Sequence, residues 1–151
     1  MDDSEKYFGN SKTLRTPAHR NMVIKFVRDQ YPQARFERIY DAHTHGWKNK
    51  DFHACCDLKG WTLTLVQTTT DFIFGGFTTA EWESPPPSLA VDKPDPSSFL
   101  FSVNEGSKYP ITGAADTQAI GCWSSYCAMF GRYGIDLGIE SDSNKNDKSW
   151  C

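Results

Sequence analysis

The chain has 151 residues and a mass of 17.1 kDa, with 38% hydrophobic and 23% charged residues, values that are typical of one globular domain. With a formal net charge of -3, the chain lacks the positive electrostatic field that binding to nucleic acid or to anionic membrane surfaces requires. No apolar stretch approaches the roughly 20 residues that cross a bilayer, and the N-terminus is too polar for a signal peptide. We therefore expect a cytoplasmic protein with no nucleic-acid partner and no membrane insertion.

Domain organisation follows from where apolar residues are scarce. Residues 1–12 predict a flexible N-terminal segment, and residues 13–151 predict a single domain. The polar residues 140–149 also lack the apolar surface needed to offset the entropy of ordering. Five cysteines, an odd number in a chain without a secretory signal, indicate reduced thiols rather than a disulfide framework.

The first half of the chain predicts two helices and a short strand between them. A hydroxyl N-cap at Thr16, followed by proline and by apolar residues at helical spacing, predicts a helix that ends near Tyr31. Residues 36–40 have the composition of a short strand. Asn49 is expected to cap a second helix, which turns one apolar face inward, formed by Phe52, Cys55 and Cys56.

From residue 61 the apolar period changes to two, which predicts an antiparallel hairpin of residues 61–67 and 72–77. The pair Gly75-Gly76 indicates a bulge or a close backbone approach. Residues 84–97 contain five of the eight prolines and predict a long loop. Further short strands are expected at residues 99–103, 119–122 and 135–139. The fold class is therefore α+β, a sandwich of two antiparallel sheets with flanking helices.

A possible metal site lies in the segment Asp41-Ala-His43-Thr-His45, because two histidines two residues apart after a strand can bind one metal ion. This pattern supports an alternative function, a small metal-dependent hydrolase. The chain is short for the barrel that usually carries the pattern, and only His19 and His53 remain as further histidines. Two solvent-exposed histidines in a loop are the simpler interpretation.

The cysteines and the loop carboxylates give weaker signals. Cys55 and Cys56 are adjacent, which does not fit the ligand spacing of a zinc site completed by Cys122 and Cys127. Cys56 and His53 are three residues apart and can meet on one helix face as nucleophile and base. Free thiols also leave open a peroxide-scavenging role, which requires a lowered pKa. The acidic residues that border the proline-rich loop are expected only to keep it solvated; they are Glu81, Glu83, Asp92 and Asp95.

The order of several short motifs resembles the TLDc domain family. The motifs are Asp51-Phe-His53, Cys56-Asp57-Leu-Lys-Gly60, Thr62-Leu-Thr-Leu65, Ile73-Phe-Gly-Gly-Phe77, Trp82, Asp95-Pro-Ser-Ser-Phe-Leu-Phe-Ser102, Lys108-Tyr-Pro-Ile111, Ala119-Ile120, Phe130-Gly131 and Asp136-Leu137. The similarity begins at about residue 35. No catalytic residues and no cofactor come with it, so the motif residues are interpreted as determinants of the fold: Phe52, His53, Cys56, Asp57, Gly60, Gly75, Gly76, Trp82, Phe99, Phe101, Gly131 and Asp136.

The resemblance implies a eukaryotic, non-enzymatic protein-interaction module. It also implies a link to oxidative-stress protection and to the vacuolar proton-pumping ATPase, whose peripheral subunits are the expected partners. Trp61 departs from the family pattern, which usually has a small residue or proline there. The pattern also normally continues through further strands after residues 140–149. We therefore expect the C-terminal part of the sandwich to be incomplete, with an open strand edge that invites pairing with another chain.

Overall fold

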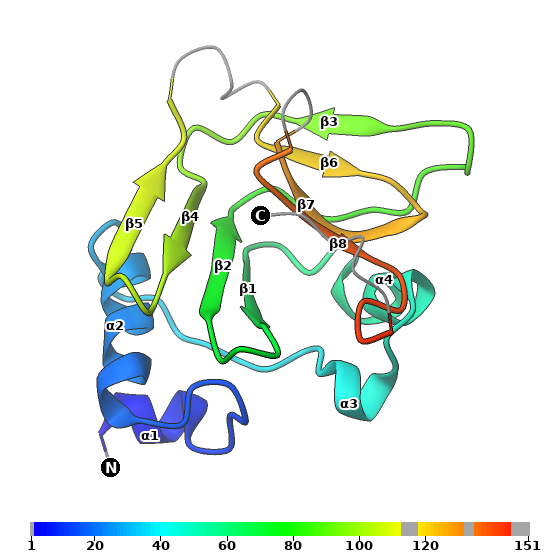
Figure 1. The fold of residues 1–151 in the computed structure, drawn as a ribbon. Helices are drawn as coiled ribbons and strands as arrows, with labels where there is room; N and C mark the ends of the chain where they lie inside the picture. Colours follow the sequence, from blue (N-terminus) through cyan, green and yellow to red (C-terminus); the bar gives the residue numbers. More distant parts are fainter. Residues whose placement is uncertain (1, 113–117, 132–134, 146–151) are drawn as a thin grey trace.

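The computed structural model describes residues 2–112, 118–131 and 135–145. Four helices and eight strands follow one another in these residues (Figure 1). The helices are α1 (Asp3–Phe8), α2 (Pro17–Arg28), α3 (Ala42–His45) and α4 (Asn49–Cys56). The strands are β1 (Thr62–Gln67), β2 (Ile73–Thr78), β3 (Val91–Lys93), β4 (Phe99–Ser102), β5 (Ser107–Pro110), β6 (Ile120–Cys122), β7 (Tyr126–Phe130) and β8 (Leu137–Glu140).

The strands form two antiparallel sheets of four, in the orders β1-β2-β4-β5 and β3-β6-β7-β8. Helix α2 covers the outer face of the first sheet, and α4 lies beside the second sheet (Figure 1). This arrangement confirms the expected α+β class and the two-sheet architecture. The expected hairpin is also confirmed, because β1 and β2 pair in continuous register from Thr62 opposite Thr78 to Gln67 opposite Ile73.

Two apolar clusters lie on opposite faces of the first sheet. One cluster joins α2 to residues such as Phe77, Phe99 and Phe101. The other joins α4 and the second sheet to Trp82, with Phe74 and Leu100 packed against it from the first sheet. The alternation of side chains along β2 and β4 therefore divides their apolar residues between the two clusters.

The two glycines of β2 mark a close approach and not a bulge. A Cβ atom on Gly75 would lie 1.8 Å from the backbone oxygen of Thr64 in β1. A Cβ atom on Gly76 would lie 2.5 Å from Cζ of Phe130 in the second sheet. Glycine at both positions thus allows β1 and the ring of Phe130 to pack directly on the β2 backbone.

The N-terminal helices are tied together by charged side chains. Thr16 caps α2 as expected, because its hydroxyl accepts a hydrogen bond from the backbone N–H of His19. In place of the flexible segment expected at residues 1–12, the structure has helix α1. Arg20 of α2 is buried and forms an ion pair with Glu5, and Arg28 forms an ion pair of 2.6 Å with Asp3. These ion pairs, together with the packing of Phe8 against Phe36, hold α1 in place.

Several boundaries differ from the sequence-based expectation. Residues 36–40 form no strand, and α2 ends at Arg28 rather than near Tyr31. Asn49 is the first residue of α4 and not its cap; Lys48 is the cap residue, and its N–H is accepted by the carboxylate of Asp51. The side-chain amide of Asn49 instead donates to the backbone oxygen of Ser124, which attaches α4 to the turn between β6 and β7.

Three short strands were not expected. The proline-rich loop of residues 84–97 contains β3, which pairs with β6 through Val91, Asp92 and Lys93. The sequence does not predict β5 or β7, because β5 ends in proline and β7 is apolar on both faces and lacks an alternating pattern. None of the described helices has the length and hydrophobicity needed to cross a lipid bilayer.

Candidate functional site

A polar cluster formed by motif residues lies at the C-terminal end of α4. Nδ1 of His53 lies 2.6 Å from Oδ1 of Asp57, one turn further along the chain. The second carboxylate oxygen of Asp57 accepts a hydrogen bond of 2.6 Å from the hydroxyl of Ser84, the first residue of the proline-rich loop. Nε2 of His53 lies 2.8 Å from the backbone oxygen of Tyr126 in β7. A chain of hydrogen bonds thus runs from the loop through α4 to the second sheet.

The order of groups in this cluster does not suit nucleophilic catalysis. A catalytic triad requires the imidazole to lie between hydroxyl and carboxylate. Here the carboxylate of Asp57 lies between Ser84 and His53. His53 is only 6% exposed, and both of its ring nitrogens already face oxygen atoms of the protein. The cluster therefore connects three segments of the fold and offers no free base.

Further hydrogen bonds join the end of α4 to Trp82 and to the start of β1, and we call this region the junction. The N–H of Leu58 donates to the backbone oxygen of Trp82, which is fully buried. The indole N–H of Trp82 donates to the hydroxyl of Thr62 at the start of β1. Leu58 and Gly60 both have positive φ angles, so the chain turns sharply between α4 and β1. The structure thus places Asp57 and Trp82 at one structural junction.

The other motif residues also lie in the framework of the fold. Phe99 and Phe101 are buried in the cluster under α2. Gly131 has a φ angle of 79° and its N–H donates to Ala119, and Asp136 donates its N–H to Phe130. Asp136 also lines a small cavity of about 290 Å³ that lies next to β4 and β8.

The buried thiols are poorly suited to redox or nucleophilic chemistry. Burial raises the pKa of both Cys56 and Cys127 to about 12. Burial also raises the pKa of Cys122. Because the thiolate is the reactive form, these three thiols are protonated and unreactive at neutral pH. His53 offers Cys56 no free nitrogen, so the sequence-based pairing of these two residues as nucleophile and base is not supported.

The two histidines of the hypothetical metal site lie in a short helix. Asp41 caps α3, because its carboxylate accepts the backbone N–H of His43, and it does not follow a strand. The ring of His45 stacks on Tyr40 and its Nδ1 accepts the N–H of Asp41. The ring of His43 packs against Trp47. In the described part of the chain, no group of three or more histidine, cysteine or acidic residues is placed to hold a metal ion.

Asp95 illustrates why the loop carboxylates give no acid–base pair. Burial alone would raise its pKa, but hydrogen bonds from Ser97, Thr78 and Thr79 outweigh this effect and lower the pKa. The side chain of Asp95 is therefore a fixed anion that closes the loop onto the end of β2. The carboxylate of Glu83 forms an ion pair of 2.7 Å with Lys93.

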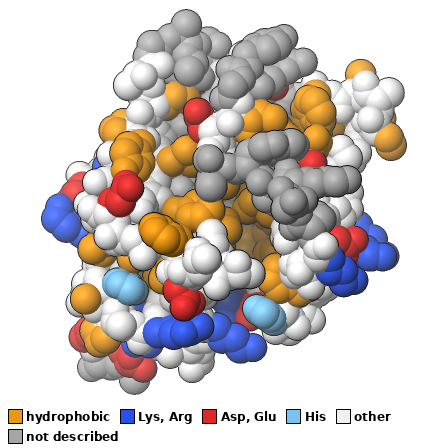
Figure 2. All heavy atoms as spheres, viewed as in Figure 1, with side chains coloured by type: hydrophobic (Ala, Val, Ile, Leu, Met, Phe, Trp, Pro, Cys, Tyr) orange, Lys and Arg blue, Asp and Glu red, His pale blue; other side chains and the backbone are white. Residues whose placement is uncertain are grey.

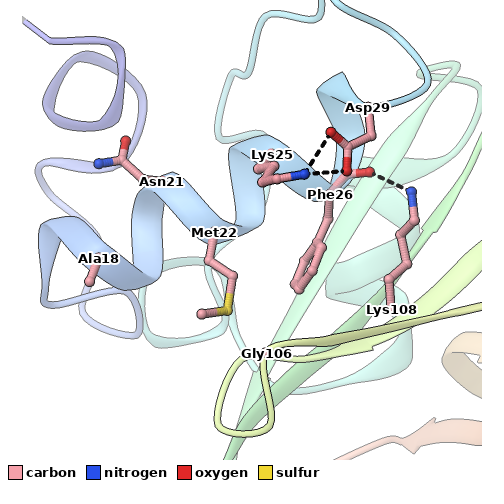
Figure 3. A pocket seen from close by; sticks show the side chains of 8 residues that line it. All are labelled: Ala18, Asn21, Met22, Lys25, Phe26, Asp29, Gly106 and Lys108. Atoms are coloured by element: carbon pink, nitrogen blue, oxygen red, sulfur yellow. Dashed lines mark hydrogen bonds and ion pairs between the residues drawn. The ribbon is translucent and has the colours of Figure 1, made fainter.

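An open pocket of about 570 Å³ lies between α2 and the turn that joins β4 and β5 (Figure 3). Its charged side chains already have partners. Lys25 forms an ion pair with Asp29, and Lys108 donates to the backbone oxygen of Phe26 while it lies over the ring of Phe99. The pocket thus holds no unpaired charge to orient a small ligand.

The proline-rich loop exposes apolar residues near this junction, as does Leu58, which is 68% exposed in the turn after α4. The segment before β3 extends away from the sheets (Figure 1). Pro86, Pro87 and Leu89 are exposed, the last to 57%. The N–H of Leu89 donates to the oxygen of Pro86, which closes a turn at the tip. Figure 2 shows hydrophobic side chains distributed over the viewed face among charged ones.

Comparison with known families agrees with the positions of these residues. A family model described as the TLDc domain matches residues 8–149. The chain belongs to the TLDc domain family. The match begins well before residue 35 and includes α2. No curated protein matches the chain at a significant level.

Proposed function

We propose that this TLDc domain is a non-enzymatic protein-interaction module that binds a protein partner through the loop of residues 84–97. One contrast supports the proposal. The polar side chains that could take part in catalysis are hydrogen-bonded to neighbouring residues, as His53, Asp57 and Ser84 are. The apolar tip of the loop, by comparison, is presented to solvent.

The loop is also held in a defined conformation, which favours binding. Ser84 is bonded to Asp57 at one end, and Pro85 is buried. At the other end, Asp95 accepts hydrogen bonds from Thr79 and Ser97, and β3 pairs with β6 in between. Since a pre-ordered loop loses little conformational entropy when it binds, its exposed prolines and leucine can contribute more of their apolar area to affinity.

The family resemblance supplies the first partner to test. TLDc domains are linked to oxidative-stress protection and to regulation of the vacuolar proton-pumping ATPase, and we propose the same cytoplasmic role for this chain. Its protein partner would then be the peripheral subunits of that ATPase. A regulatory function of this kind needs no cofactor and no catalytic residue in the domain.

The experiment measures binding of the full chain to the purified peripheral sector of the ATPase. Leu89→Asp places a charge at the tip of the loop and should weaken binding at least about tenfold, as expected for an apolar anchor at the centre of an interface. Phe72→Asp is the matched control, because Phe72 is 54% exposed in the turn between β1 and β2, away from the loop. Equal affinity of both variants and the unmodified chain would contradict the proposed binding face.

A further inference from the structure

Strand β1 differs from the other three strands at the edges of the two sheets. β5 carries Lys108 and Pro110, β3 carries Asp92 and Lys93, and β8 ends at Glu140. Charges and prolines on edge strands prevent pairing with other chains. β1 has the sequence Thr-Leu-Thr-Leu-Val-Gln, with no charge, proline or bulge along six residues. It therefore lacks the residues that protect an exposed edge.

The hydrogen-bond pattern shows which groups of β1 point outward. The N–H of Thr68 donates to the oxygen of Phe72 across the hairpin. Because backbone groups alternate in direction along an antiparallel strand, the even-numbered residues of β1 face β2. Leu63, Leu65 and Gln67 then direct their N–H and C=O groups away from the sheet. Within the described ranges, no backbone or side-chain group forms a hydrogen bond with these six polar groups.

Burial indicates that this edge is accessible. All six residues of β1 are partly exposed, whereas five of the six residues of neighbouring β2 are buried. Leu63 and Leu65 pack against the cluster under α2 but keep part of their side chains exposed. Trp61, directly before the strand, is 55% exposed, and its ring centroid lies 4.4 Å from that of Tyr31. The edge thus combines unpaired backbone groups with apolar surface.

We propose that two copies of this chain associate by antiparallel pairing of β1 with β1, with Leu65 opposite Leu65 of the second copy. This register places Leu63 opposite Gln67 of the second copy. All six outward backbone groups of each strand then find partners, which a register centred on Leu63 would not achieve because Gln67 would be left unpaired. The chain has a net charge of -3, but the paired edges themselves carry no charge that would repel the second copy.

The expected complex is a weak dimer, because a single pair of short strands buries less area than a typical stable interface. The inference does not depend on the proposed function, since the dimer uses β1 and not the loop of residues 84–97.

The test is sedimentation equilibrium of the full chain at concentrations up to about 100 µM, the range in which a small interface is populated. Gln67→Pro removes an outward N–H and no hydrogen bond to β2. Thr64→Lys places a charge on the edge. Tyr109→Lys is the control, because Tyr109 is 49% exposed on β5, at the opposite edge of the same sheet. Thermal melting followed by circular dichroism reports whether each variant folds.

The unmodified chain and Tyr109→Lys should form dimers, and both β1 variants should be folded monomers with at least about tenfold weaker association. A monomer at every concentration would overturn the proposal, and so would a dimer that persists in the folded β1 variants. If Gln67→Pro does not fold, Thr64→Lys alone decides between these results.

Discussion

The carboxylate of Asp57 accepts the hydroxyl of Ser84 at 2.6 Å, and this bond joins the end of α4 to the start of the proline-rich loop. The two residues are 27 positions apart in the chain. The other oxygen of the carboxylate lies against the buried ring of His53. One side chain thus connects the position of the loop to the packing of α4 on the second sheet.

Removing Ser84 and removing Asp57 should lower the free energy of unfolding by different amounts. Ser84→Ala loses one exposed hydrogen bond, so we expect the free energy of unfolding to fall by about 0.5–1 kcal/mol. Asp57→Ala leaves the buried imidazole without its partner, so a loss of about 1–3 kcal/mol is expected. Urea unfolding followed by tryptophan fluorescence measures both. Equal losses would contradict the role of Asp57 as the link between Ser84 and His53.

The variants Gly75→Ala and Gly76→Ala should differ in whether a second substitution restores their stability. Gly75→Ala brings a methyl group against the backbone of β1, which cannot move aside, whereas the atoms nearest to the Gly76→Ala methyl group belong to the ring of Phe130. Overpacking of this kind typically costs about 1–3 kcal/mol. Adding Phe130→Leu should recover part of the loss in Gly76→Ala and none in Gly75→Ala.

A control for this comparison is Gly121→Ala, because the nearest atom to the added methyl group is Sδ of the flexible Met129 side chain, at 3.3 Å. Its midpoint of urea unfolding should stay close to that of the unmodified chain. The account of the close approach fails if the Phe130→Leu substitution rescues both glycine variants equally.

The buried thiols should not react with alkylating reagents in the folded chain. At pH 7, iodoacetamide should leave Cys56 and Cys127 unmodified in the native state and label both in urea, as mapped by mass spectrometry. The reason is that burial holds their pKa near 12, far above the pH of the reaction. Labelling of either residue at the rate of free cysteine would contradict this assignment and support a thiol-based role.

The raised pKa values of Cys56 and Cys127 predict a loss of stability at high pH. A native pKa above the ordinary thiol value of 9.0 means that the unfolded chain releases the proton first. Stability should therefore be independent of these groups below about pH 9 and fall towards pH 12, by at most about 1.4 kcal/mol per pH unit for each thiol. Cys127→Ala should reduce this slope in urea unfolding measured from pH 8 to 11.

Metal analysis tests the alternative function directly. Because His43 and His45 pack against separate aromatic rings, the purified chain should carry less than about 0.1 equivalents of zinc after preparation without chelator. A stoichiometric metal that His43→Ala and His45→Ala both remove would revive the hydrolase hypothesis.

The elements that the sequence predicts well are those with a strong local signal. The N-cap at Thr16 and the alternation that begins at Trp61 fix α2 and the β1–β2 hairpin, and the structure confirms both. The close approach at Gly75 and Gly76 also follows from local sequence, although its partners, Thr64 and Phe130, do not. Family motifs extend the prediction to the two-sheet fold.

The elements that the sequence misses depend on tertiary contacts. α1 is held by ion pairs to Arg20 and Arg28, which lie in another helix. β3 is placed between prolines and is defined only by its pairing with β6. The bond from Ser84 to Asp57 could not be predicted, because nothing in the local sequence of either residue indicates the other. The capping role of Asp41 could be predicted from sequence, since an acidic residue before a short helix is a typical N-cap.

Hydrogen–deuterium exchange tests most directly whether residues 84–97 form the binding face. The full chain is compared alone and in complex with the peripheral sector of the vacuolar ATPase. The account predicts slower exchange at the amides of Ser88, Leu89 and their neighbours in the complex, with no change in the turn of residues 68–71. Stable binding that leaves exchange in the loop unchanged would contradict it.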